Sequence, residues 1–290
     1  MKRHNITKSV LSISSPGTHL TPGDDAEARR LTRQVNNDMA RICAEYPDSF
    51  LFFASLPLPD VPGSLEEIDY ALDNLGAVGF QILTNSHGVY PGDSRFAPVF
   101  DKLSQRKTKV FFHPTSCHLR SADGQSVQDV NPQPGIPRPM VEFMFDSTRA
   151  YMSLFLSGTM TRCPGITVLA CHCGGTFPPV LERIAEFSGP LLGKENQITS
   201  EYVKDILQKR FYFDLAGMPF PDKVQGLLRL VDPSRLVYGS DYPYTPGPFV
   251  SIMAARVENG LAELSKQFGR DVKGQVLKAN AEEFLNGATE

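Results

Sequence analysis

Residues 110–114 read Val-Phe-Phe-His-Pro, an apolar run that ends in a single metal-type ligand. Two later runs end in the same way, residues 168–172 (Val-Leu-Ala-Cys-His) and residues 236–241 (Leu-Val-Tyr-Gly-Ser-Asp). The three terminal ligands are His113, His172 and Asp241. Catalytic groups of an α/β barrel lie at the carboxyl ends of several different parallel strands. The three endings therefore predict a barrel enzyme with metal-assisted chemistry.

The rest of the chain alternates strand and helix patterns. We expect strands at 8–13, 50–56, 77–83, 109–113, 166–172, 211–215 and 235–240. Helical patterns cover 24–45, 64–75, 93–106, 140–157, 179–187, 204–208, 222–230, 249–268 and 272–285. The order predicts one α/β domain over residues 1–290, a (β/α)8 barrel of the metal-dependent hydrolase type that lacks its first strand-helix unit.

Three local features carry more specific expectations. Ser64 and Glu67 are placed as a capping box, so we expect a helix to begin at Ser64. Residues 116–139 are rich in Pro and too polar for a regular element, which predicts a lid-like loop over the site. Period-two alternation in the strands at 166–172 and 235–240 puts His172 on the face of Ala170, and Asp241 on the face of Gly239.

Composition excludes several classes of protein. The net charge of −3 and the absence of a long Lys or Arg block argue against nucleic acid as a partner. No stretch approaches the roughly 18 apolar residues of a membrane span, and the first residues lack an apolar signal core, so we expect a soluble cytoplasmic protein. The five cysteines include no Cys-x-x-Cys pair and indicate reduced thiols. A dinucleotide-binding Gly-x-Gly-x-x-Gly is also absent.

Five segments, in this order, carry a family resemblance: residues 11–17, 53–60, 112–115, 172–178 and 239–243. Together they resemble the amidohydrolase-related decarboxylases, which include aminocarboxymuconate semialdehyde decarboxylase, γ-resorcylate decarboxylase and, as the most similar group, the fungal 6-methylsalicylate decarboxylases. The resemblance implies His113 and Asp241 as ligands of a divalent ion, zinc as the expected metal and manganese as the alternative. It implies that His172 contacts the metal's water or the substrate. It also implies a homodimer that acts on a small aromatic carboxylic acid.

The start of the chain departs from the family pattern. Members open with a strand that ends in His-x-His and supplies two more ligands. The six histidines of this chain, none two apart, are His4, His19, His87, His113, His118 and His172. We therefore expect one strand-helix unit to be absent and favour a truncated reading frame as the reason.

The resemblance implies non-oxidative decarboxylation of a hydroxylated aromatic acid, which releases CO2 and a phenol. Asp241 would deliver a proton to the ring carbon, and His172 would orient the substrate and hold Asp241 in its working protonation state. Family members that act on substrates with two carboxylates tend to carry an additional arginine in the helix after His-x-Gly-Gly. Here Arg183 is followed one turn later by Phe187, which, together with Met140, Phe143 and Phe145, favours an apolar ring substituent and hence 6-methylsalicylate or an orsellinate-like acid. Two alternatives stay open: metal-dependent hydrolysis of a lactone or amide, and a catalytically impaired remnant.

Further residues are assigned with an alternative beside each. Arg149, Phe145 and Asp214 are candidate substrate-binding residues, although Arg149 could instead pair with Asp146 on the helix surface and Asp214 could instead fasten its loop. Cys171 and Cys173 are expected to be structural thiols. His87 and His118 are expected to be solvated loop histidines.

Overall fold

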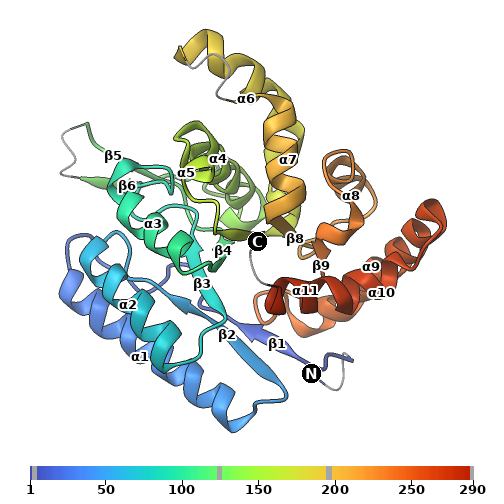
Figure 1. Cartoon of the computed structure of the whole chain (residues 1–290), viewed down its shortest axis with the longest axis horizontal. Helices are drawn as coiled ribbons and strands as arrows, with labels where there is room; N and C mark the ends of the chain where they lie inside the picture. Colours follow the sequence, from blue (N-terminus) through green and yellow to red (C-terminus); the bar gives the residue numbers. More distant parts are fainter. Residues whose placement is uncertain (2–4, 123–125, 194–197, 288–290) are drawn as a thin grey trace. The chain divides into compact units, whose positions relative to one another are not determined.

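The computed structural model describes residues 1, 5–122, 126–193 and 198–287. The chain folds into two compact units, the first from Met1 to Thr167 and the second from Val168 onward. Each unit has its own set of parallel strands, and the strands alternate with helices along the chain (Figure 1). No described helix is both long enough and apolar enough to span a bilayer.

The first unit contains a parallel sheet in the order β1 (Ser9–Leu11), β2 (Phe50–Ser55), β3 (Gly79–Leu83) and β4 (Lys109–His113). Ser55 of β2 is the register partner of Gln81, and Leu83 is the partner of His113. Since side chains alternate along a strand, Ser55, Gln81 and His113 lie on one face of this sheet. The helices α1 (Asp25–Glu45), α2 (Val61–Asn74) and α3 (Ala97–Gln105) lie side by side in chain order beside the strands (Figure 1).

A buried amide holds these helices to the sheet. Asn36 of α1 donates from Nδ2 to the Ser55 carbonyl oxygen (3.0 Å) and to Glu67 Oε1 (2.8 Å). The Ser55 N–H donates in return to Asn36 Oδ1 (2.8 Å). One side chain therefore fixes the carboxyl end of β2 between α1 and α2, which positions Ser55.

The predicted capping box at Ser64 is wrong. Helix α2 begins at Val61, because Asp60 caps it by accepting from the Gly63 N–H (3.2 Å) and a proline stands in its first turn. Glu67 instead accepts from Asn36 and Arg33. The helix therefore begins three residues before Ser64, where Asp60 and the proline of the first turn provide a stronger start signal than the capping box.

The expectation that residues 116–139 contain no regular element is also wrong. Strands β5 (His118–Arg120) and β6 (Val127–Asp129) form an antiparallel pair with His118 opposite Asp129, and a 3-10 turn η3 (Arg138–Met140) follows. Backbone pairing therefore organises part of this segment. Helices α4 (Glu142–Leu156) and α5 (Thr159–Arg162) complete the first unit.

In the second unit the parallel order is β7 (Thr167–Ala170), β8 (Phe211–Asp214) and β9 (Leu236–Val237). Its helices and helical turns are η4 (His172–Gly174), α6 (Phe177–Leu192), α7 (Ser200–Arg210), α8 (Asp222–Leu227), η5 (Pro233–Arg235), α9 (Gly247–Phe268), α10 (Val272–Gly274), η6 (Gln275–Ala279) and α11 (Asn280–Asn286). The strands expected from the sequence are all present in the two units, and the expected helices match except at their ends.

Two strands end earlier than expected. β7 stops at Ala170 and β9 at Val237, so His172 and Asp241 lie beyond the strands in loops. Their backbones are left-handed, with φ of 50° and 55°. The predicted period-two alternation therefore does not reach either residue, and the left-handed backbone of each lies outside strand geometry.

We predict that Asn36→Ala lowers the free energy of unfolding by about 3 kcal/mol, because it removes three buried hydrogen bonds and leaves the Glu67 carboxylate with fewer donors. Chemical denaturation measures the change. Asn37→Ala is the matched control: Asn37 is the next residue of α1, is exposed and, among the described side chains, accepts only from Tyr70. An equal loss in both variants would contradict the clamping role of Asn36.

Candidate active site

His113 is the last residue of β4 and is half-buried. Its Nδ1 lies 2.7 Å from the Pro114 carbonyl oxygen, which can only accept, so Nδ1 carries the proton. The Nε2 atom is then the nitrogen with the lone pair. A backbone carbonyl that orients a histidine in this way is typical of metal-ligating histidines. The donor chemistry of His113 therefore fits a divalent ion.

His172 follows β7 and is held by the buried carboxylate of Asp214. The backbone N–H of His172 donates to Asp214 Oδ1 (2.8 Å), and the backbone N–H of Ala216 donates to the same oxygen (3.1 Å). Asp214 is the last residue of β8. Asp214 therefore holds the loops that follow β7 and β8, which is one of the two roles expected for it. Its role in substrate binding stays a prediction.

Two glycines let the loops of this region approach closely. A Cβ at Gly217 would lie 2.7 Å from His172 Nδ1, and Gly217 has φ of +71°. A Cβ at Gly239, after β9, would lie 3.2 Å from the Cβ of Asp214. The imidazole of His172 thus rests against bare backbone, and larger residues at either position would displace the polar side chains.

Asp241 is bound by its own loop. Its Oδ2 accepts from Thr245 Oγ1 (3.2 Å), and its carbonyl accepts from the Thr245 N–H (2.8 Å). Burial raises the pKa of the Asp241 carboxyl; the His172 ring and the Thr245 hydrogen bond lower it, and the negative charge of Asp214 raises it further. His172, Asp214 and Asp241 therefore interact electrostatically within the second unit, as expected for His172 and Asp241.

The remaining predicted residues belong to the first unit. Phe145 and Arg149 lie four residues apart on α4, hence on one helix face, and Phe145 is exposed. Arg149 lies 3.8 Å from the carboxylate of Asp146, the ion pair weighed as its alternative role. His4 lies outside the described residues.

Asp146 is a feature that the sequence reading missed. It is fully buried, not on the helix surface, and it accepts hydrogen bonds from Thr84, from Asn85 Nδ2 (2.9 Å) and from the Tyr90 hydroxyl (2.6 Å). Burial raises the pKa of Asp146, and the three donors oppose this. The network fixes the loop after β3, and because its donors lie about 60 residues earlier in the chain, the sequence carried no signal for it.

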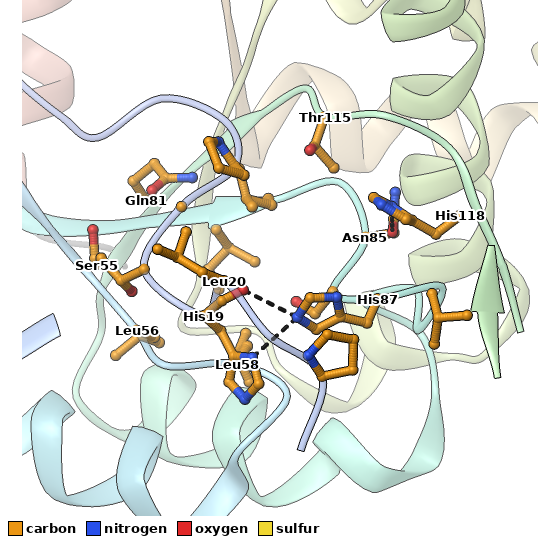
Figure 2. Close-up of a pocket in the computed structure, with 18 of the residues that line it drawn as sticks. His19, Leu20, Ser55, Leu56, Leu58, Gln81, Asn85, His87, Thr115 and His118 are labelled. Atoms are coloured by element: carbon orange, nitrogen blue, oxygen red, sulfur yellow. Dashed lines mark hydrogen bonds between the residues drawn. The ribbon is translucent and has the colours of Figure 1, made fainter. Parts of the chain in front are cut away.

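The prediction of solvated histidines at 87 and 118 is wrong. His87 Nε2 lies 3.0 Å from His19 Nδ1, and the His87 and His118 rings are 6.2 Å apart. His19 is buried and also contacts the Asp25 carboxylate (3.0 Å). The three histidines line a cavity of about 280 Å³ in the first unit (Figure 2).

The thiols behave as expected. All five cysteines are free, and Cys171 and Cys173 are buried beside His172. Burial raises the pKa of the Cys173 thiol to about 12, which disfavours the thiolate that binds metals. Across the described parts of the chain, no three His, Cys, Asp or Glu side chains gather as a metal site would require.

Comparison with known proteins gives consistent matches. The sequence model of a family described as amidohydrolase matches residues 4–287. "Decarboxylase yanB" of Aspergillus niger is 33% identical over 284 residues, which cover 93% of this chain and 74% of that protein. "6-methylsalicylic acid decarboxylase acuB" of Aspergillus aculeatus is 33% identical over 282 residues, covering 96% of this chain and 81% of that protein.

Solved structures match over almost the whole chain. A crystal structure described as an amidohydrolase has a TM-score of 0.81 and 29% identity, and covers 99% of this chain and 86% of its own. A 5-carboxyvanillate decarboxylase from Novosphingobium aromaticivorans, with bound manganese and a nitrobenzoic acid, has a TM-score of 0.83 at 21% identity, covering 98% and 78%. The predicted fold class, an α/β fold of the amidohydrolase barrel type, is confirmed.

We predict that Gly217→Ala displaces the His172 ring, because the new methyl group would overlap Nδ1. Gly269→Ala is the matched control: it has a similar φ of +64° with no atom within 4 Å of the added Cβ. Both variants should lose about 1–2 kcal/mol from the left-handed backbone. Only Gly217→Ala should shift the His172 imidazole resonances in an NMR spectrum; unchanged resonances would contradict the close approach.

Proposed function

The chain belongs to the amidohydrolase family, and from this membership we propose that it decarboxylates a hydroxylated aromatic acid in a metal-dependent, non-oxidative reaction. The predicted resemblance to the decarboxylases of this family is confirmed, because relatives about one-third identical carry that name. The chain is therefore an enzyme of the carboxy-lyase class. The observation that best supports the finer proposal is the electrostatic interaction of Asp241 with His172 and Asp214, which come from the loops after β7 and β9 and from the end of β8.

Asp241 is the proposed proton donor, through the carboxyl oxygen that would not hold the divalent ion. Loss of CO2 breaks the bond between the ring and the carboxylate, and its electron pair remains on the ring carbon. That carbon then takes the proton of Asp241, which leaves the phenol and an aspartate that regains its proton from water. Because burial raises the pKa of Asp241, the carboxyl keeps its proton at a higher pH than an exposed aspartate does.

His172 is the proposed substrate-orienting residue. Its charge interacts with Asp241, and a protonated imidazole would lower the pKa of that carboxyl. The position of the ring is constrained twice, by the hydrogen bond from its backbone to Asp214 and by the contact with Gly217. A ring fixed in this way can act on one orientation of the substrate.

His113 and Asp241 are the proposed ligands of the divalent ion. When bound, such an ion holds the substrate carboxylate and the neighbouring phenol oxygen together and stabilises negative charge. The tautomer of His113 supports its part in this assignment. We propose zinc, with manganese as the alternative because a manganese ion is bound in the carboxyvanillate decarboxylase of similar fold.

The proposed substrate is 6-methylsalicylate. The name of the Aspergillus aculeatus relative supports this choice. Within the chain, the Arg183 guanidinium lies 4.7 Å from the ring centroid of Phe187 on the exposed surface of α6, so this pair does not distinguish an apolar substituent from a second carboxylate. Arg149 and Phe145, on one face of α4, are proposed to contact the acid group and the ring of the substrate, and Asp214 remains a proposed third contact.

We also propose that the enzyme is a cytoplasmic homodimer. Free thiols at all five cysteines agree with a reducing compartment. The dimer rests on the family resemblance alone.

We predict opposite effects for two histidine variants. His113→Ala should weaken metal binding by more than the roughly 10- to 100-fold that follows loss of a residue that only hydrogen-bonds to a ligand, because here a ligand itself is removed. His172→Ala should keep the metal and lower kcat by about 100-fold or more. Metal analysis and CO2 release measure both, and each variant is the control for the other. Equal metal loss in the two would mean that the roles are misassigned.

Removal of the metal should abolish turnover. We expect dialysis against a chelator to stop CO2 release from 6-methylsalicylate and added zinc to restore it. Greater recovery with manganese than with zinc would contradict the choice of metal. Full activity of a protein shown by elemental analysis to be free of divalent ions would contradict metal dependence itself.

A further inference from the structure

A cavity of about 280 Å³ lies within the first unit, between the loop at residues 16–22 and the ends of β2 and β3 (Figure 2). Its volume is close to the lower end of ordinary ligand pockets, about 300 Å³, which suits a compound of one ring. None of its described lining residues is assigned above to the reaction.

Two buried polar groups on the cavity wall have no partner in the described part of the chain. Ser55 and Gln81 are 2% and 3% exposed, and they are register partners on neighbouring strands. Ser55 Oγ and Gln81 Nε2 are buried and make no hydrogen bond to any residue that the structure describes. Because nearly all buried polar atoms in proteins are paired, this neighbouring hydroxyl and amide indicate a place for a ligand oxygen.

Two histidines on the wall offer acceptors. His87 Nε2 lies 3.0 Å from the His19 carbonyl oxygen, so Nε2 carries the proton and Nδ1 keeps a lone pair. Asn85 donates from Nδ2 to Asp146 and to the Ser116 carbonyl, which directs its Oδ1 toward His118 Nδ1 (3.2 Å). His118 Nε2 therefore keeps a lone pair too.

The charges around the cavity disfavour an anion. No Lys or Arg occurs among the described lining residues, and the lining carboxylate, Asp129, is paired with Arg138. Burial lowers the pKa of His87 to about 4; the charges of His19, His118 and Arg120 also lower it, and the hydrogen bond to the His19 backbone opposes them, so the ring is neutral at neutral pH. A carboxylate would lose its water here with no Lys or Arg among the described lining residues to pair with.

The rest of the wall is apolar. Leu56, Leu58, Ile82, Leu83 and Val127 contribute to it. Such side chains suit an aromatic ring better than a sugar or another polyol, because most of a polyol surface must be hydrogen-bonded.

We propose that this cavity binds an uncharged one-ring phenol, whose oxygen accepts from Gln81 and Ser55 and whose hydroxyl donates to His87 or His118. The site goes beyond the proposed reaction, since it uses none of the catalytic residues. The phenol released by decarboxylation belongs to this chemical class, so the cavity would hold product while rejecting the acid. Only the choice of probe rests on the proposed function.

The test measures binding of 3-methylphenol and of 6-methylsalicylate to the metal-free full chain by equilibrium dialysis, with resorcinol as a second uncharged phenol. Gln81→Leu and Ser55→Ala should each weaken phenol binding by roughly three- to tenfold, the effect of one hydrogen bond. Their Tm should stay unchanged or rise, because each removes an unpaired buried polar atom. Gln225→Leu, on the exposed face of α8, is the control and should change neither quantity.

Several results would overturn the proposal: neither phenol binds, the acid binds as tightly as the phenols, or both variants bind as the parent protein does. A lowered Tm with unchanged binding would mean that Ser55 and Gln81 are structural. Failure of phenol binding in a protein that still releases CO2 contradicts the cavity assignment alone. Phenol binding in a protein that never releases CO2 contradicts the proposed reaction alone.

Discussion

The second unit depends on one buried carboxylate, that of Asp214 at the end of β8. A single oxygen of Asp214 accepts from the backbone of His172 and of Ala216, so it joins the loop after β7 to the loop after β8. Gly239, in the loop after β9, packs against the same side chain. Because a buried carboxylate is costly without donors, these hydrogen bonds and the loop geometry stabilise each other.

This arrangement places strained backbone where the chemistry is proposed. His172, Cys173 and Asp241 all have left-handed φ values, which ordinary residues adopt at a cost of about 1–2 kcal/mol each. The strands and the Asp214 hydrogen bonds offset that cost. The His172 imidazole and the Asp241 carboxyl thereby interact electrostatically, and the burial of Asp241 favours its protonated form.

Much of the fold follows from the sequence because parallel strands are short apolar runs whose order can be read directly. The polar ends of those runs, His113, His172 and Asp241, were identified for the same reason. The errors arose where tertiary contacts decide. Asp146 lies in an amphipathic helix, and only packing shows that its carboxylate is buried. Gln81 interrupts the apolar strand Gly-Phe-Gln-Ile-Leu, but its missing partner and the nearby histidine cluster depend on residues distant in sequence.

The central claim is a reaction that breaks a carbon–carbon bond and protonates the ring at the same carbon. The most direct measurement uses 6-methylsalicylate labelled with 13C in the carboxyl group, incubated with the metal-loaded enzyme in D2O. The account predicts 13CO2 and 3-methylphenol in equal amounts, with deuterium on the ring carbon that had carried the carboxylate. Consumption of substrate without 13CO2, or deuterium at other ring positions only, would contradict it.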